Sequence, residues 1–122
     1  MPVTGVVAQL RTADLTRSIR FYTEKLGLAL EFRHEDFYAG IRAGRTVFHL
    51  KLADEADPSI PYVEDGGHFH LYLEVDDADA MAASLTQKGV PLVCPPDDTP
   101  WGTRELVIRD DQGHTIYLGQ RR

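Results

Sequence analysis

The sequence predicts an α+β protein of 122 residues, in which two tandem βαβββ modules form a curved mixed sheet, a cup with the helices outside. Residues 67–79 alternate strictly between apolar and polar side chains, as a strand with one core face does. The order strand, helix, strand, strand, strand occurs twice, with the copies offset by 62 or 63 positions. The composition, 43% hydrophobic and 26% charged, is that of a globular chain, and we expect one domain over residues 1–122.

The first module is expected over about residues 5–52. Its first strand covers residues 6–12, where apolar and polar side chains alternate. A helix follows, with Asp14 as its N-cap and Gly27 in the left-handed position after its end. Its apolar side chains recur at steps of four, three and four residues, at Leu15, Ile19, Tyr22 and Leu26. Three further strands are expected at about residues 28–33, 36–43 and 46–52.

The second module is expected over about residues 68–120. Residues 53–67 are polar and rich in proline and glycine, so we interpret them as a linker. Asp77 lies 63 positions after Asp14 and Gly89 lies 62 after Gly27, so they mark the second helix. Its apolar stripe is expected at Ala78, Met81 and Leu85, and its strands at about residues 68–75, 91–94, 103–109 and 114–119.

Alternation also assigns each strand residue to a face. Four apolar residues of the strand 68–75 are expected to face the helices: Phe69, Leu71, Leu73 and Val75. The side chains expected to line the cup are Tyr38, His49, His68, His70, Tyr72, Glu74, Glu105 and Tyr117. On the strand 36–43, the same parity sends Phe37 to the helices.

Charge and composition exclude several classes of partner. The net charge of −6 argues against nucleic acid and favours neutral or cationic small molecules. No apolar run approaches the roughly 20 residues that cross a membrane, and no signal peptide is visible, so we expect a cytoplasmic protein. The single cysteine, Cys94, excludes an internal disulfide and is expected to be buried.

Three stretches, residues 14–27, 70–77 and 109–118, resemble motifs of the vicinal oxygen chelate superfamily. This superfamily comprises glyoxalases, bleomycin resistance proteins, extradiol dioxygenases and thiol transferases. The resemblance runs from about residue 5 to residue 120 and implies the fold predicted above. It also implies a homodimer, with exchange of modules between subunits left open, but the shared motifs do not select one chemistry.

The resemblance also defines four inward positions at which metal-dependent members place ligands. In this sequence they fall at Val7, His49, His70 and Tyr117. Valine has no ligand atom, and a phenol with an ordinary pKa of about 10 is a poor anionic ligand. Two imidazoles are fewer than the ligands of ordinary catalytic sites. We therefore expect no metal and no other cofactor; the alternative is a divalent metal ion held by His49 and His70.

The stretch 100–106 is similar to one common in the bleomycin resistance branch. That similarity implies a small-molecule-binding protein that sequesters a bulky aromatic or cationic ligand, of the antibiotic or drug type, in an aromatic and acidic cup without metal. The expected ligand-binding residues are Tyr38, His49, His68, His70, Tyr72, Glu74, Trp101, Glu105 and Tyr117.

Several alternatives stay open. Trp101 has a second interpretation as a core or dimer-contact residue, and Tyr72 and Tyr117 have one as hydrogen-bonded partners that fill the cup. The sequence favours a binding protein over an enzyme. The enzymatic alternatives are a metal-dependent lyase, isomerase or dioxygenase using His49 and His70, and a metal-free enzyme with His70 as base and Tyr117 as acid.

Overall fold

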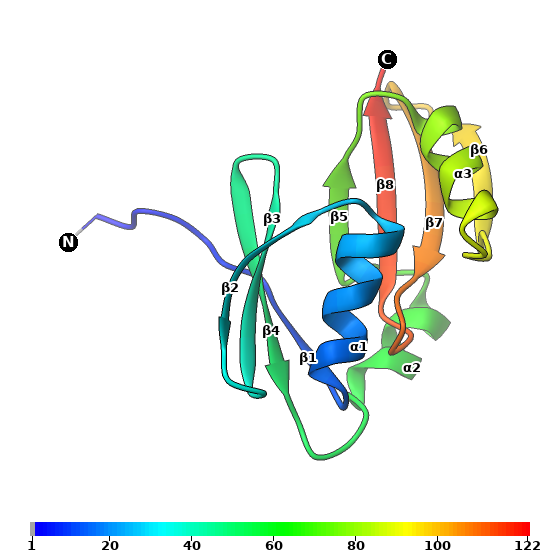
Figure 1. Ribbon diagram of the computed structural model, residues 1–122. Helices are drawn as coiled ribbons and strands as arrows, with labels where there is room; N and C mark the ends of the chain where they lie inside the picture. The colour runs from blue at the N-terminus through cyan, green and yellow to red at the C-terminus, as the bar shows by residue number, and fades with distance from the viewer. Residues whose placement is uncertain (1) are drawn as a thin grey trace. The chain divides into compact units, whose positions relative to one another are not determined.

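The computed structural model describes residues 2–122, which form two compact units, unit 1 up to Ala56 and unit 2 from Asp57 to Arg122. Each unit contains one four-stranded mixed sheet, and strand, helix, strand, strand, strand follow one another in both (Figure 1). The predicted α+β class and the repeated βαβββ order are confirmed.

Unit 1 consists of β1 (Gln9–Thr12), α1 (Leu15–Arg20), the π-helix η1 (Phe21–Lys25), β2 (Ala29–His34), β3 (Tyr38–Ala43) and β4 (Thr46–Leu52). The strand order is β1-β4-β3-β2, with β1 parallel to β4 and the other pairs antiparallel. Helix α1 covers one face of this sheet (Figure 1). The core between them contains Leu10, Leu15, Ile19, Tyr22, Leu26, Ala39, Ile41, Phe48 and Leu50.

The first helix begins and ends where the sequence predicts. Asp14 is the N-cap and its carboxylate accepts a hydrogen bond from the Arg17 backbone N–H at 3.1 Å, while Gly27 has a φ of 72°. The widening into η1 was not predicted. The Thr23 hydroxyl donates to the Ile19 carbonyl at 2.9 Å, and such back-bonding competes with the regular helical ladder where the wider turn begins.

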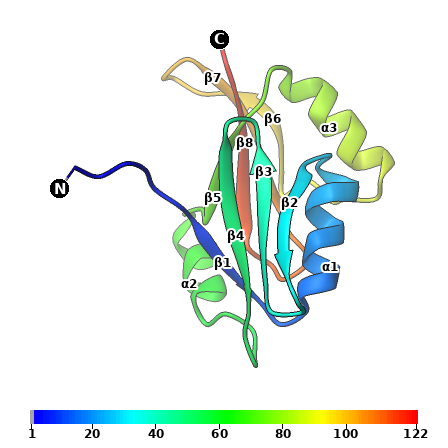
Figure 2. The same ribbon diagram turned by 60° about the vertical axis from the view of Figure 1, so that its left-hand side comes forward.

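Unit 2 consists of α2 (Ser59–Gly66), β5 (Leu71–Glu74), α3 (Ala78–Gln87), β6 (Cys94–Asp98), β7 (Thr103–Arg109) and β8 (Thr115–Arg121). The strand order is β5-β8-β7-β6, with β5 parallel to β8 (Figure 1). Figure 2 shows β4, β3 and β2 of unit 1 side by side. Asp77 caps α3 by accepting from the Ala80 N–H at 3.0 Å, and Gly89 has a φ of 80°, as predicted. The core contains Ala78, Ala82, Leu85, Val90, Leu106, Ile108, Ile116 and Leu118.

The segment 53–67 is not an irregular linker, because helix α2 lies inside it. Its prolines stand before and within the first turn, where a missing N–H costs nothing, and the Asp57 carboxylate accepts from the Ser59 N–H at 2.9 Å. Gly67, with a φ of 67°, ends the helix. Read together, these signals describe a short helix rather than a flexible connection.

Strand β5 is shorter than the predicted strand 68–75, and the predicted alternation fails before Leu71. Phe69, expected in the core, is 49% exposed, because the chain leaving α2 is extended only from Leu71. Strand β6 begins at Cys94 and carries Pro95 and Pro96, which suit the edge position it occupies.

Two further side-chain predictions in unit 2 were wrong. Cys94, expected to be buried, is exposed on the edge strand β6. In α3, Ala82 rather than Met81 completes the buried stripe with Ala78 and Leu85. Among residues 2–122, none of the helices combines the length and apolar character needed to cross a bilayer.

Candidate functional site

Each unit presents a group of aromatic and polar side chains on the sheet face that does not carry the core. We call Gln9, Phe32, Tyr38 and His49 the unit 1 surface, and Phe69, Tyr72, Thr103, Glu105 and Tyr117 the unit 2 surface. Alternation explains both, because the neighbours of these residues along β4, β7 and β8 are the buried core residues.

On the unit 1 surface, hydrogen bonds join three neighbouring strands. The Gln9 amide donates to the Tyr38 hydroxyl at 3.0 Å, and that hydroxyl lies 3.0 Å from His49 Nδ1. The Phe32 ring packs edge-on against His49 at 5.3 Å and parallel to Tyr38 at 6.4 Å. The structure therefore brings together the predicted residues Tyr38 and His49, with two residues that sequence reasoning did not single out.

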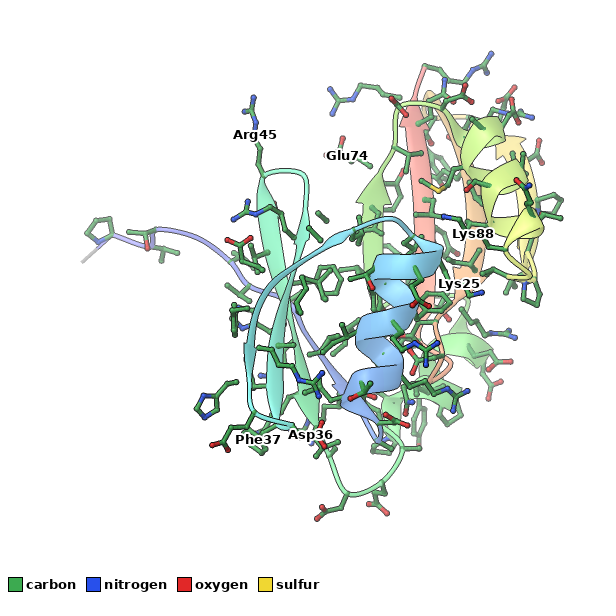
Figure 3. The ribbon with its side chains drawn as sticks, viewed as in Figure 1. Lys25, Asp36, Phe37, Arg45, Glu74 and Lys88 are labelled. Carbon is green, nitrogen blue, oxygen red and sulfur yellow. The ribbon has the colours of Figure 1, made fainter. Side chains whose placement is uncertain are left out.

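The Phe32 ring reaches His49 because Gly40 of β3 lies between them. Gly40 pairs with Phe32 on one side and with His49 on the other, and a Cβ at this position would collide with the Phe32 ring. Phe37, expected to face the helices, is instead 49% exposed at the turn between β2 and β3, beside Asp36 (Figure 3).

On the unit 2 surface, two hydroxyl groups hold one carboxylate oxygen. Tyr72 Oη donates to Glu105 Oε2 at 2.7 Å, and Thr103 Oγ1 donates to the same oxygen at 2.8 Å. Thr99 Oγ1 lies 2.8 Å from Thr103 Oγ1 and extends the chain of hydroxyls. Burial, together with the hydrogen bond and the negative charge of Glu105, raises the pKa of Tyr72 to about 12. Tyr72 therefore keeps its proton and acts as a donor.

Tyr72 reaches Glu105 across a whole strand. Tyr72 lies on β5 and Glu105 on β7, and β8 runs between them. Gly119 of β8 pairs with Glu105, and a Cβ at this position would collide with the Tyr72 hydroxyl and ring. The missing side chain at Gly119 is therefore the structural condition for the Tyr72–Glu105 hydrogen bond.

Three rings pack beside this carboxylate. Phe69 lies 5.8 Å from Tyr72 and 5.2 Å from Tyr117, and the two tyrosine rings are 6.4 Å apart, measured between centroids. The tyrosines do not bond each other: Tyr72 donates to Glu105, and the Tyr117 hydroxyl donates to the Gly67 carbonyl at 3.3 Å. Phe69, which alternation predicted to face the helices, therefore belongs to the unit 2 surface instead.

His70 does not join these rings. Its Nδ1 accepts from the Thr115 N–H at 3.3 Å, so Nε2 carries the proton and donates to Ser59 Oγ at 3.0 Å. Its ring packs edge-on against the buried His114 at 4.5 Å. Burial and the neighbouring His114 lower the pKa of His70, while the Asp57 carboxylate opposes that shift. His70 therefore fastens α2 to the start of β8.

The Asp57 carboxylate completes this cluster at the start of α2. Burial alone would raise the pKa of Asp57. Hydrogen bonds from the Ser59 backbone N–H and hydroxyl, together with the electrostatic influence of the nearby His114 and His70, outweigh burial and lower that pKa. With its Nε2–H directed at Ser59, neutral His70 does not act as a base toward that hydroxyl.

Three other predicted site residues lie apart from the two surfaces. His68 is exposed, with its ring beside Gly66. Glu74 is exposed at the end of β5 and forms an ion pair with Arg121 at 3.3 Å (Figure 3). Trp101 is 72% exposed in the turn between β6 and β7, so it is not a core residue of this chain.

The four positions implied for a metal lie two in each unit, and several of their side-chain atoms already have protein partners. Val7 has no ligand atom, and both ring nitrogens of His70 are engaged by Thr115 and Ser59. The Tyr117 hydroxyl donates to a carbonyl, and His49 Nδ1 lies against Tyr38. Within residues 2–122, no cluster of three or more His, Cys, Asp or Glu side chains is placed to hold a metal ion.

Sequence reasoning missed residues whose role depends on contacts between strands. These residues are Gly119, Gly40 and Thr103, which carry neither a ring nor a charge. Gly119 leaves space for Tyr72, Gly40 pairs with His49, and the Thr103 hydroxyl donates to Glu105. The one available signal was parity, which already placed Gly119 on the same face as Tyr117.

Comparison with known families gives one match over nearly the whole chain. The model of the family described as "Glyoxalase/Bleomycin resistance protein/Dioxygenase superfamily" matches residues 5–118. A relative named "Putative glyoxylase CFP32", from Mycobacterium tuberculosis (strain CDC 1551 / Oshkosh), is 31% identical over 108 residues. That match covers 86% of this chain but only 39% of the relative, so the chain spans well under half of that protein.

Solved structures share the fold. TnmS3, titled an antibiotic binding protein from Streptomyces sp. CB03234, has a TM-score of 0.74 and 25% identity, with all of both chains covered. The bleomycin-binding protein of Streptomyces verticillus, solved with copper(II)-bleomycin, has a TM-score of 0.73 and 21% identity, covering 100% of this chain and 99% of the other. At 21% identity, the second likeness concerns the fold alone.

Proposed function

The chain belongs to the Glyoxalase/Bleomycin resistance protein/Dioxygenase superfamily, and from that premise we propose that it binds a small molecule without metal and without chemical conversion. The proposed ligand carries an aromatic ring and a protonated amine, and the unit 2 surface holds it. The ring packs beside Phe69, Tyr72 and Tyr117, and the amine pairs with Glu105.

The observation that supports this proposal is that Glu105 has hydroxyl donors but no cationic partner among residues 2–122. Other carboxylates of the chain, such as Glu31, Glu64 and Asp98, pair with arginines. Glu105 has neutral hydroxyl donors on Oε2, and no cationic side chain of residues 2–122 lies within ion-pair distance of it. A half-buried carboxylate without a counter-ion favours a cation supplied from outside.

The aromatic side chains add a second, independent preference. Each aromatic pair contributes about 0.5–1.5 kcal/mol beyond burial, and a cation against a ring face contributes about 0.5–2 kcal/mol. The exposed Phe69 supplies apolar area that the folded chain leaves uncovered. Both terms favour a flat cation over a flat neutral molecule, and a flat neutral molecule over an aliphatic one.

The relatives support a binding role and leave one alternative. TnmS3 and the bleomycin-binding protein bind antibiotics, and we extend that class of ligand, an antibiotic or another drug, to this chain. The name of the relative CFP32 supports the alternative, a metal-dependent enzyme of the lyase, isomerase or dioxygenase type using His49 and His70. We further propose a homodimer, on the resemblance of the sequence, and a cytoplasmic location, on the globular composition without a membrane-spanning apolar run.

The test compares two probes that differ only in charge. We expect 2-(1-naphthyl)ethylamine, protonated at pH 7, to bind at least about tenfold more tightly than the neutral 2-(1-naphthyl)ethanol, because a charge-assisted hydrogen bond contributes about 1.5–3 kcal/mol. Glu105→Gln should abolish this difference while retaining the alcohol's affinity. Calorimetry or NMR titration measures both dissociation constants.

The matched control is Glu74→Gln, which removes a carboxylate that already pairs with Arg121. It should change the amine's affinity less than twofold. Equal binding of amine and alcohol, unchanged in Glu105→Gln, would contradict the role of Glu105, and the absence of binding by either probe would contradict the unit 2 surface. One tightly held metal ion per chain together with turnover would favour the enzyme.

A further inference from the structure

The two hydrogen bonds that Glu105 accepts end on one of its two carboxylate oxygens. Tyr72 and Thr103 both donate to Oε2, at 2.7 Å and 2.8 Å, and within residues 2–122 no donor meets Oε1. An ionised carboxylate offers about four lone pairs, shared equally between its two oxygens. The protein therefore occupies both lone pairs of Oε2 and leaves those of Oε1 for a ligand.

The carboxylate is held in this orientation from two strands. Tyr72 reaches Oε2 from β5 across Gly119, and Thr103 reaches it along β7 itself. The Thr103 hydroxyl gives its proton to Glu105, so it accepts from the Thr99 hydroxyl at 2.8 Å. The Thr99 hydroxyl in turn accepts from the Thr103 N–H at 3.2 Å. Turning the carboxylate so that both oxygens faced a ligand would break both bonds to Oε2.

We propose that the unit 2 surface selects its cation by the geometry of the head group, and that it prefers an ammonium group to a guanidinium or amidinium group. The preference rests on the proposed role of Glu105, whose partner cation it assigns to a chemical class. A guanidinium pairs best with a carboxylate as a fork, with one N–H donated to each oxygen. An ammonium concentrates its charge on one nitrogen and pairs fully with Oε1 alone.

A carboxylate elsewhere in the chain shows the fork that Glu105 lacks. The Arg42 guanidinium donates to both oxygens of Glu31, from Nε to Oε2 at 2.7 Å and from Nη2 to Oε1 at 2.9 Å. At Glu105, the hydroxyls of Thr103 and Tyr72 occupy one of the two oxygens that such a fork requires. Thr103 therefore determines specificity without meeting the cation itself, because its hydroxyl removes an acceptor and leaves the negative charge in place.

The first measurement compares 2-(1-naphthyl)ethylamine with its guanidine analogue, which has the same ring and linker. Both probes are cations at pH 7. We expect the native chain to bind the amine about three- to tenfold more tightly, measured by calorimetric or NMR titration. Equal affinities, or a tighter guanidine, would overturn the preference while leaving Glu105 as the partner of a cation. The absence of binding by both probes would overturn the proposed function as well.

The second measurement frees one lone pair of Oε2 at a time. Thr103→Val removes the threonine donor and keeps a branched side chain, and Tyr72→Phe removes the tyrosine donor and keeps the ring. A fork uses one of these two lone pairs, so in at least one variant the guanidine should gain about three- to tenfold relative to the amine. A ratio of dissociation constants that stays at its native value in both variants would contradict the role of Oε2.

Two further variants separate the hydrogen bond from other effects of the substitution. Thr86→Val makes the same change at an exposed position of α3 and should alter the ratio less than about twofold. Thr103→Ser returns the hydroxyl that Thr103→Val removes, and it should restore the preference for the amine. A serine variant that behaves like the valine variant would assign the effect to packing at position 103 and contradict the occupied oxygen as its cause.

Discussion

At the scale of single residues, the absence of a side chain at Gly119 has the largest effect on the unit 2 surface. Tyr72 crosses β8 above this residue and gives its proton to Glu105, and a Cβ at position 119 would occupy the same space. Tyr72, Glu105 and Tyr117 were predicted on this face from alternation, a local property. The crossing of a strand depends on register between β5, β8 and β7, which alternation does not determine.

Gly119→Ala should therefore displace Tyr72 and leave Glu105 with one donor fewer. We expect a loss of about 1–3 kcal/mol in the free energy of unfolding, because the strand must accept an overpacked site or a broken hydrogen bond. The pKa of Tyr72, about 12 in the native chain, should fall toward its ordinary value, measured by ultraviolet titration.

Two controls isolate the collision. Gly5→Ala adds a Cβ where no atom lies within 4 Å, and should leave stability within about 0.5 kcal/mol. In a Tyr72→Leu background, Gly119→Ala should lose most of its effect, since the two sites are coupled. An equal cost in both backgrounds would show that the strand, rather than Tyr72, resists the alanine.

At the scale of elements, helix α2 shows how a connecting segment becomes structure. Its prolines and glycines were interpreted as signs of a linker, yet the same residues suit the start and end of a short helix. The contacts that hold it are distant in sequence: His70 bonds Ser59 and Thr115, and Glu64 pairs with Arg109 at 3.0 Å. Composition alone does not reveal such contacts.

The attachment of α2 should weaken in acid. Protonation of His70 puts a second donor opposite the Thr115 N–H, and the fold lowers the pKa of His70 from 6.5, so the unfolded chain binds more protons below about pH 6.5. Stability should be complete above that pH and fall below it, by less than about 1.4 kcal/mol per pH unit. The Asp57 carboxylate and the His114 ring face the same imidazole.

Urea unfolding at pH 8 and pH 5.5, on the native chain and on His70→Gln, separates the contribution of His70 to the acid sensitivity from that of other titrating groups. Glutamine retains an acceptor for Thr115 and a donor for Ser59 but does not titrate. The native chain should lose more stability between the two pH values than the variant. Equal losses would assign the acid sensitivity to groups other than His70.

At the scale of the whole molecule, the internal repeat is preserved in the backbone more than in the side chains. Asp14 and Asp77 have nearly the same conformation, with φ of −148° and −147°, and Gly27 and Gly89 both have positive φ. These helix-capping and helix-terminating residues made the fold predictable, because their roles depend only on neighbouring residues in the sequence. The two surfaces differ, since the hydrogen bonds of unit 1 involve His49 on β4 and those of unit 2 involve Glu105 on β7.

The repeat predicts matched effects in the two units. Asp14→Ala and Asp77→Ala should each lower the free energy of unfolding by about 1 kcal/mol, because each removes one cap of the same geometry. The losses should add in the double variant, since the caps share no hydrogen-bond partner. Asn at either position keeps the capping oxygen and serves as the control in urea unfolding; a strongly unequal pair would contradict the equivalence of the caps.

Gly40 and Gly119 also mark an evolutionary shortcut. At Gly40 an added methyl group would displace the Phe32 ring, and at Gly119 it would displace the Tyr72 ring. The polar residues of both surfaces would remain in the sequence. A lineage adapting to a new compound could therefore change the binding surface by one substitution at either glycine, with the fold retained. Libraries that vary these two glycines first would sample altered ligand preference with few mutations.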